Sequence, residues 1–200
     1  KVLAAVHGPR EPPQRSQQIQ DRGSIVCEFA TAAFGTGERR RRVKGDRRSV
    51  EMSSRIRKAL EATVLLELYP RSQICVYLQV LQADGGVQSV CINAAVMALV
   101  DAGVALKDLL GACTVGYLEG RPLLDINFPE ESAGGPELAI ACLPALDQIA
   151  HVEMDNKLSV ETLEEVLALG TSGCKIMSKH MRQYAHDRTV QLVAARGTYS

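Results

Sequence analysis

Seven cationic side chains within ten residues form the densest chemical group in the sequence: Arg39, Arg40, Arg41, Arg42, Lys44, Arg47 and Arg48. Cations this close repel one another unless anions are near, so we expect the segment to be solvated or bound to phosphate groups. A nuclear-localisation signal or a merely solvated loop would have the same composition. Arg55 and Arg57 extend the charge onto the helix predicted next, which favours a folded surface for RNA or another polyanion. Aromatic residues make up only 4% of the chain, which favours contacts with a nucleic-acid backbone over base stacking.

The charge balance of the whole chain also indicates a polyanion partner. The net charge is zero, with 23 Lys and Arg against 23 Asp and Glu. Residues 1–58 hold 14 of the cations and 6 of the acids, a local net of +8, so residues 59–200 hold 9 and 17, a local net of −8. A strongly basic part of a neutral chain predicts one surface that binds a polyanion.

Two adjacent glycines mark a second place where chemistry could occur. Residues 81–86 (LQADGG) are expected to lead from a strand into a helix. Gly85 and Gly86 permit a close backbone approach, and the N–H groups at the start of a helix attract anions. By itself, this pattern is typical of an ordinary tight turn.

The cysteines and histidines show no metal-ligand or redox spacing. The six cysteines, at 27, 75, 91, 113, 142 and 174, include no C-x-x-C pair and mostly lie in apolar stretches, so we predict buried, reduced thiols. The four histidines, at 7, 151, 180 and 186, are interpreted as structural or surface groups. No apolar run reaches the ~18 residues that a membrane span needs, so no membrane partner is predicted.

Seven strands are predicted from apolar alternation and turn residues. They cover residues 2–6, 23–29, 73–82, 110–117, 122–127, 138–143 and 148–154. Loops are expected at residues 7–13, 35–46 and 129–137, where Gly, Pro or charged residues cluster.

Three helices complete the predicted elements. The first runs from an N-cap at Ser49 to a stop at Pro70, the second covers residues 87–102, and the third runs from about Ser159 to about His186. Mixed strands and helices place the chain in the α/β or α+β class. With 46% hydrophobic residues the chain can bury one core, and one domain over residues 1–200 is the economical organisation.

Several motifs agree in order and spacing with a known family. Residues 69–74 (YPRSQI), 81–86 (LQADGG) and 101–103 (DAG) resemble the RNase PH family. Three further motifs narrow the resemblance to the members that form the ring of the RNA exosome: residues 37–41 (GERRR), 45–49 (GDRRS) and 131–135 (ESAGG). The resemblance covers essentially the whole chain. The family's N-terminal Arg-x-Asp-Gly-Arg motif has no counterpart here, and Lys1 leads directly into a predicted strand, so we expect upstream residues to be missing.

The resemblance implies an RNase-PH-like fold, with a βαβ unit like domain 2 of ribosomal protein S5 and a sheet and helices in two layers. It also implies a hetero-hexameric ring with other RNase-PH-like subunits, RNA-binding cap subunits of the S1/KH type on one face, and a separate catalytic nuclease. Single-stranded RNA would pass through the ring for 3′-to-5′ degradation and ribosomal RNA processing. The nucleus, the nucleolus and the cytoplasm are the expected locations.

Active members of this family cleave RNA from its 3′ end with inorganic phosphate as the attacking group. Cations or oriented N–H donors must neutralise that phosphate, and acidic residues must protonate the leaving oxygen and help to place a divalent metal. Where active members have Thr-Arg-Ser/Thr after the two glycines, this chain has Val87, Gln88 and Ser89. A neutral amide replaces the cation, and charge-assisted hydrogen bonds are roughly twice as strong as neutral ones. Gly85, Gly86, Gln88 and Ser89 are therefore interpreted as the remnant of a phosphate site.

The two catalytic aspartates of active members correspond to Glu131 and Glu137, which are six residues apart. Each carboxylate stands one methylene farther from the backbone, and a displacement of about 1 Å can cost on the order of a hundredfold in rate. Alternatively, both glutamates are exposed turn acids without a catalytic role. We therefore predict a non-catalytic ring subunit with no cofactor and no metal. The alternatives are an active phosphorolytic 3′-to-5′ exoribonuclease and a free-standing RNA-binding module.

The positions that guide RNA in this family agree with its pattern better than the phosphate-site and catalytic positions do. Arg15 and Ser16 correspond to the loop that lines the pore, and Arg47 and Arg48 to arginines that grip the RNA backbone beside the active site. A salt bridge to a ring neighbour is the alternative for these arginines. The full set of residues predicted to bind RNA is Arg15, Ser16, Arg39, Arg40, Arg41, Arg42, Lys44, Arg47 and Arg48.

Overall fold

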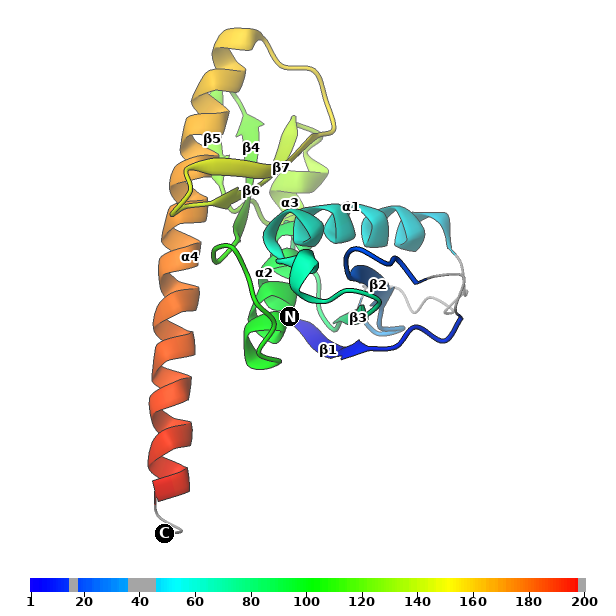
Figure 1. Cartoon of the computed structure of the whole chain (residues 1–200). Coiled ribbons are helices and arrows are strands. Elements are labelled where there is room, and N and C mark those ends of the chain that lie inside the picture. The colour runs from blue at the N-terminus through cyan, green and yellow to red at the C-terminus, as the bar shows by residue number, and fades with distance from the viewer. Residues whose placement is uncertain (15–17, 36–45, 198–200) are drawn as a thin grey trace.

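The computed structural model describes residues 1–14, 18–35 and 46–197, and this part of the chain forms two sheets with helices packed against them (Figure 1). The first sheet has the strand order β1-β3-β2 and consists of β1 (Val2–Arg10), β2 (Ser24–Thr31) and β3 (Gln73–Val80). β1 is antiparallel to β3, whereas β2 is parallel to it. Because α1 (Arg47–Thr63) connects the parallel strands β2 and β3, the βαβ unit that the family resemblance implies is present.

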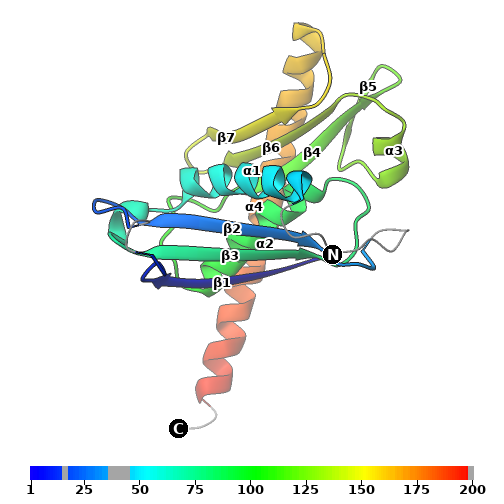
Figure 2. The ribbon, with the colours of Figure 1, turned by 90° about the vertical axis from the view of Figure 1, so that its right-hand side faces the viewer.

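Both α1 and α2 (Val87–Asp101) contribute to the core on one side of this sheet, with α2 behind the strands in Figure 2. Leu60 of α1 and Ile92 of α2 are at most 1% exposed. The opposite side is partly exposed, since Leu3 is 59% and Val26 36% exposed whereas Cys75 of the central strand is 3% exposed. Alternate side chains of β3 belong to the core and are at most 2% exposed, as the predicted alternation requires: Ile74, Val76, Leu78 and Val80.

The second sheet is antiparallel throughout and has the order β5-β4-β6-β7. Its strands are β4 (Gly111–Leu118), β5 (Arg121–Leu124), β6 (Glu137–Leu143) and β7 (Gln148–Met154). Two helices accompany it, the short α3 (Phe128–Ser132) and the long α4 (Val160–Gly197). A 3₁₀ turn, η2 (Leu66–Leu68), lies between α1 and β3.

Small residues allow α4 to lie close against the second sheet. A Cβ atom at Gly173 of α4 would stand 2.7 Å from Cys113 Sγ of β4, and a Cβ at Gly170 would stand 2.8 Å from a methyl carbon of Ile140. Real Cβ atoms do not approach so closely, so the helix could not sit here with alanines at both positions without a shift. The close approach encloses a second core cluster that includes Val115, Leu138 and Ile140.

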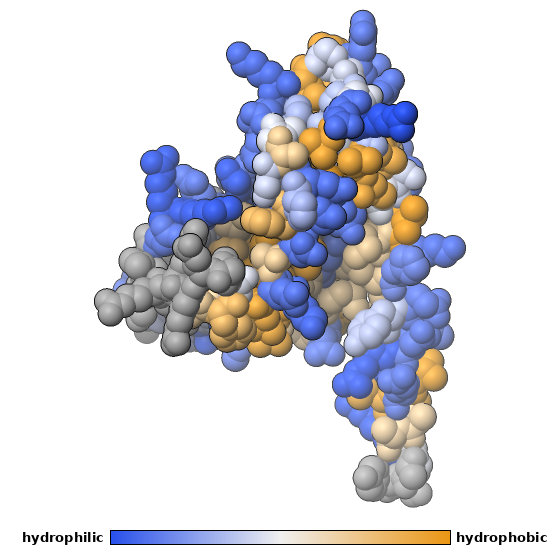
Figure 3. Space-filling model, turned by 180° about the vertical axis from the view of Figure 1, so that it is seen from behind, coloured by the Kyte–Doolittle hydropathy of each residue, from blue (hydrophilic) through white to orange (hydrophobic). Residues whose placement is uncertain are grey.

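The C-terminal part of α4 extends beyond the body of the molecule (Figure 1). Seen from behind, this extension carries mainly hydrophilic side chains with apolar ones scattered between them (Figure 3). Tyr184, Val190 and Val193 are all more than half exposed. No helix within the described residues has both the length and the apolarity required to cross a bilayer.

The predicted mixed α/β class is confirmed, and the predicted strands and helices are present with shifted ends. β7 has the predicted bounds, and α2 ends one residue earlier than predicted. β5 ends at Leu124, before the predicted Asn127, and α4 continues to Gly197, beyond the predicted His186. Five of the six cysteines are buried and Cys27 is half-buried; all six are free thiols.

Both predicted ends of α1 are wrong. The helix begins at Arg47 with Asp46 as its N-cap, because Val50 N already donates to Asp46 O at 3.0 Å. Ser49 is therefore inside the first turn. The helix ends at Thr63 instead of near Pro70, because Val64 is extended and forms an isolated bridge with Leu106. Pairing with a distant segment overrides the local helical pattern.

Two predicted loops contain regular structure. β1 continues through Gly8 to Arg10, which pairs with Gln73 after a register shift. The acidic segment 129–137 contains the end of α3, whose start is fixed by a capping box. Asn127 Oδ1 accepts from Glu130 N at 3.1 Å, and Glu130 Oε2 accepts from Asn127 N at 2.9 Å. The spacing Asn-x-x-Glu is a sequence signal for this helix, although the segment was predicted as a loop.

Candidate functional site

A small pocket of about 140 Å³ lies where α1, the start of α2, α3 and the strands β6 and β7 meet. Two arginines line it, Arg48 and Arg55, both from α1. Five carboxylates also line it: Glu51, Glu131, Glu137, Glu153 and Asp155. Cations thus come from the first half of the chain and most of the acids from the second half.

The two glycines place the start of α2 at this pocket. Gly85 and Gly86 have φ angles of +84° and +54°, a region that side chains disfavour. A Cβ at Gly85 would collide with the backbone carbonyl of Ile126, and one at Gly86 would stand 3.2 Å from Thr114 Oγ1. The tight turn therefore holds the first residues of α2 between the two sheets.

Of the predicted phosphate-site remnant, Gln88 reaches the pocket and Ser89 does not. Ser89 is 4% exposed, and its hydroxyl is 2.7 Å from Thr114 Oγ1 in the interior. The single hydroxyl retained from the family motif is thus bonded within the fold. Gln88, in contrast, is among the pocket-lining residues although it is only 8% exposed.

The amide group of Gln88 has two partners on β7. Its Nε2 donates to Glu153 Oε2 at 3.1 Å and lies 3.0 Å from His151 Nε2. The other carboxylate oxygen of Glu153, Oε1, is 2.7 Å from Nη2 of Arg55. Glu153 therefore joins Arg55 and Gln88 into one network across the pocket.

Glu131 and Glu137 come together as the family resemblance implies. Glu131 is in α3 and Glu137 is the first residue of β6, and both line the pocket. Burial raises the pKa of Glu137 to about 7, with further contributions from the negative charges of Glu131 and Asp155. A carboxyl group with this pKa is protonated about half of the time near neutral pH, so it could donate a proton there.

The predicted RNA-binding arginines differ in position. Arg48 lines the pocket, whereas the Arg47 side chain is 92% exposed and its Nε is 2.9 Å from Glu51 Oε1. Arg15, Ser16, Arg39, Arg40, Arg41, Arg42 and Lys44 lie outside the described residues. The RNA contacts of all these residues stay predictions.

Two acids of β7 and the turn after it line the pocket but are absent from the sequence interpretation: Glu153 and Asp155. Successive residues of a strand point to opposite faces, so residues 151 and 153 share a face of β7. Polar residues spaced by two between the apolar Ile149, Val152 and Met154 were the available signal. His151, interpreted as a structural or surface group, lies beside Gln88.

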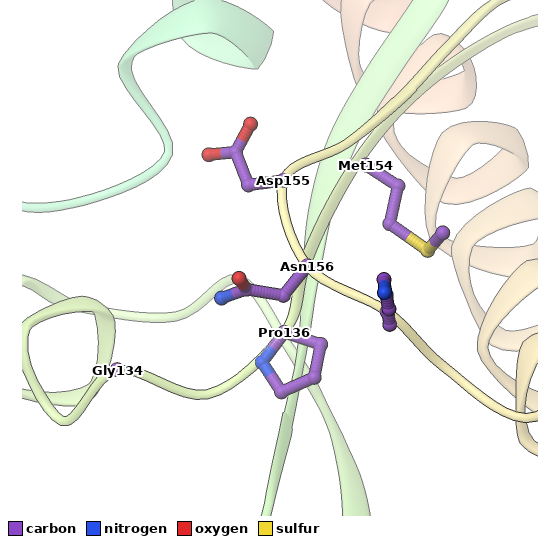
Figure 4. Close-up of a pocket in the computed structure, with 6 residues that line it drawn as sticks. Gly134, Pro136, Met154, Asp155 and Asn156 are labelled. Atoms are coloured by element: carbon purple, nitrogen blue, oxygen red, sulfur yellow. The ribbon is translucent and has the colours of Figure 1, made fainter.

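A wider hollow of about 660 Å³ adjoins the pocket and shares Asp155 with it. Gly134 and Pro136, which precede β6, line one part of it (Figure 4). The side chains of Asp155 and Asn156 point to one side of the chain and that of Met154 to the other (Figure 4). Among the described residues, no group of three or more His, Cys, Asp or Glu side chains is arranged to hold a metal ion.

Comparison with known proteins identifies the class. Models of the 3′ exoribonuclease family, the RNase PH family, match residues 1–105 with domain 1 and residues 108–173 with domain 2. The chain belongs to this family, and the resemblance predicted from the motifs is confirmed. The main core includes residues from both matched parts, such as Leu99 and Leu110, and the prediction of a single domain stays a prediction.

Particular relatives within the family are exosome subunits. The exosome complex component RRP41 homolog of Arabidopsis thaliana is 50% identical over 193 residues, which are 96% of this chain and 80% of the relative. The exosome complex component RRP41 of Homo sapiens is 43% identical over 197 residues, again 96% of this chain and 80% of the relative. The crystal structure of Rrp46 from rice (Oryza sativa) superposes with a TM-score of 0.79 at 28% identity, covering 92% of this chain and 83% of that one.

Proposed function

We propose that this chain is a non-catalytic ring subunit of an RNA exosome, where it forms part of the channel through which single-stranded RNA passes. Membership of the 3′ exoribonuclease family and similarity to proteins named exosome complex component RRP41 support the ring role. Its proposed partners are other RNase-PH-like ring subunits, cap subunits of the S1/KH type and a separate catalytic nuclease. The proposed locations are the nucleus, the nucleolus and the cytoplasm.

The non-catalytic part of the proposal rests on the chemistry of Gln88 and on its hydrogen-bond partners. The position that holds a phosphate-binding cation in active family members has a neutral amide, and this amide is bonded to Glu153 and His151. Phosphorolysis requires a bound phosphate dianion, which five pocket carboxylates against two arginines repel. The attacking group would therefore be absent.

The RNA-guiding part of the proposal is supported by Arg48 and by the density of cations just before it in the sequence. Contacts with phosphates should be blind to sequence and sensitive to salt. In the assembled ring, Arg48→Gln is expected to weaken binding of an RNA that reaches the channel and to lower the salt slope by about 0.7 for one lost contact. Lys157→Gln, at the wider hollow, is the matched control and should leave the slope unchanged.

The direct test is a phosphorolysis assay on the reconstituted ring with every other nuclease subunit inactivated. Tailed RNA and inorganic phosphate are supplied, and nucleoside diphosphates are measured. We expect no release above background and no change in the variants Glu131→Gln and Glu137→Gln. Release that depends on phosphate and stops in these variants would refute the non-catalytic assignment. Failure of the chain to enter a ring with other family members would refute the ring role.

One observation favours a second function, that of an active phosphorolytic 3′-to-5′ exoribonuclease. The raised pKa of Glu137 is suited to a general acid that protonates the leaving oxygen of RNA near neutral pH. Under this alternative, the rate should fall as pH rises through about 7 and should be lost in Glu137→Gln. The same assay, repeated between pH 6 and pH 8, distinguishes the two functions.

A further inference from the structure

An acid is hydrogen-bonded to Gln88, the residue that stands where active members of the family have a phosphate-binding arginine. Glu153 Oε1 is 2.7 Å from Arg55 Nη2, and Glu153 Oε2 accepts from Gln88 Nε2 at 3.1 Å. A guanidinium and an amide N–H are donors of a kind that can also bind a phosphate oxygen. Glu153 is thus bound as an anion by the groups around it, although it belongs to the chain itself.

Several features show that this contact is built into the fold. Arg55 is on α1, Gln88 is on α2 and Glu153 is on β7, so three elements distant in sequence converge on one carboxylate. Gln88 is 8% exposed and the Glu153 side chain 21% exposed, so neither group is freely solvated. Within the described residues, every fully buried side-chain nitrogen or oxygen has a hydrogen-bond partner.

We propose that Glu153 is an internal counter-anion that occupies the phosphate side of the pocket and keeps inorganic phosphate out. The loss of phosphate binding then rests on two residues, Gln88 and Glu153, and restoring the cation alone is insufficient. An arginine introduced at position 88 would pair with Glu153, just as Arg55 does now. Only removal of the carboxylate as well would free two guanidinium groups for an external oxyanion.

This inference deepens the proposed function, since it takes the pocket to be the remnant of a phosphate site, but it requires neither RNA nor ring partners. The experiment titrates inorganic phosphate into the full chain by calorimetry at low ionic strength. Four proteins are compared: the wild type, Gln88→Arg, the double variant Gln88→Arg/Glu153→Gln, and the control Gln88→Arg/Glu51→Gln. The control removes one negative charge from Glu51, another carboxylate of the same pocket. Glu51 forms its ion pair with the exposed Arg47.

We expect phosphate affinity to be at least ~10-fold higher in the Glu153 double variant than in Gln88→Arg, which should differ little from the wild type. The Glu51 control should resemble Gln88→Arg. If Gln88→Arg alone binds phosphate as tightly as the double variant, Glu153 does not exclude the anion and the inference is overturned. Equal gains in the Glu51 and Glu153 variants would also overturn it, in favour of a general effect of charge.

A measurement on the wild type keeps the inference testable if a variant does not fold. The side-chain amide protons of Gln88 should exchange with solvent much more slowly than those of the exposed Gln148, because Gln88 is bonded to Glu153. In Glu153→Gln, an isosteric change, the Gln88 amide resonances should move while those of Gln148 stay in place. Exchange at Gln88 as fast as at Gln148 would sink the proposal. Failure to assemble into a ring would count against the proposed function but would not affect the phosphate titration or the amide exchange, because neither measurement needs ring partners.

Discussion

The two walls of the pocket carry charges of opposite sign, and their charged side chains differ in the partners that they reach. The α1 wall contributes Arg48 and Arg55, whereas the opposite wall of β6, β7 and the turn after β7 contributes Glu137, Glu153 and Asp155. Arg55 crosses the gap, and its Nη2 lies 2.7 Å from Glu153 Oε1. Glu137 has Glu131 and Asp155 near it instead, and its pKa rises to about 7. Two glutamates on one wall thus have opposite electrostatic surroundings, decided by which side chain reaches them.

The acidic wall depends on the buried core beneath it, and a substitution there should have the largest effect. Leu138 follows Glu137 in β6 and is 1% exposed in the second core cluster. Leu138→Ala should lower the free energy of unfolding by about 2–4 kcal/mol, because it removes buried methyl groups and leaves a cavity. Urea denaturation measures this loss. Leu124→Ala, at a side chain that is 40% exposed, is the matched control and should cost less than about 1 kcal/mol.

The raised pKa of Glu137 predicts a dependence of stability on pH. Between about pH 4.5 and pH 7 the folded protein binds more protons at Glu137 than the unfolded chain does. The free energy of unfolding should therefore fall as pH rises through this window. Glu137→Gln cannot lose a proton, so at pH 8 it should be more stable than the wild type by about 1–2 kcal/mol.

Denaturation curves at pH 5.5 and pH 8 check this expectation, and Glu164→Gln, at an exposed carboxyl on α4, serves as the control. The control should change stability equally little at both pH values. Equal stability of Glu137→Gln and the wild type at pH 8 would show that Glu137 is not held in an unfavourable charged state.

The smallest expected effect is the difference in coupling energy between two ion pairs of α1. Arg55 and Glu153 come from different elements and have side-chain exposures of 39% and 21%. A double-mutant cycle with Arg55→Gln and Glu153→Gln should give a coupling of about 0.5–1 kcal/mol. Arg47 and Glu51, one turn apart on the helix surface, should show no coupling outside experimental error. A larger coupling for the surface pair would contradict the importance of partial burial.

Local sequence was sufficient for the elements whose pattern is strong. The strict alternation of β3 and the almost entirely apolar α2 were predicted within two residues of their observed ends. The ends of α1 were wrong because the bridge from Val64 to Leu106 involves residues that are not neighbours in the chain. Likewise β1 continues past Gly8 because Gln73 of β3 pairs with Arg10.

The candidate site was also predictable only in part. Gln88, Glu131 and Glu137 were found because each lies in a family motif or two residues after one, at a spacing that can be read along the chain. Glu153 was missed because its importance depends on two residues far from it in sequence, Arg55 and Gln88. The local pattern of β7 indicates that His151 and Glu153 share a face, but not that this face meets α1 and α2.

The family, the mixed α/β class and the replacement of a phosphate-binding cation by Gln88 follow from the order and spacing of residues along the chain. Which charges meet depends instead on how the elements pack. Coulombic and hydrogen-bond energies depend on distances between side chains, and the packing of α1, α2 and β7 sets those distances. That packing brings Glu153 within hydrogen-bonding distance of both Arg55 and Gln88, and it surrounds Glu137 with other acids.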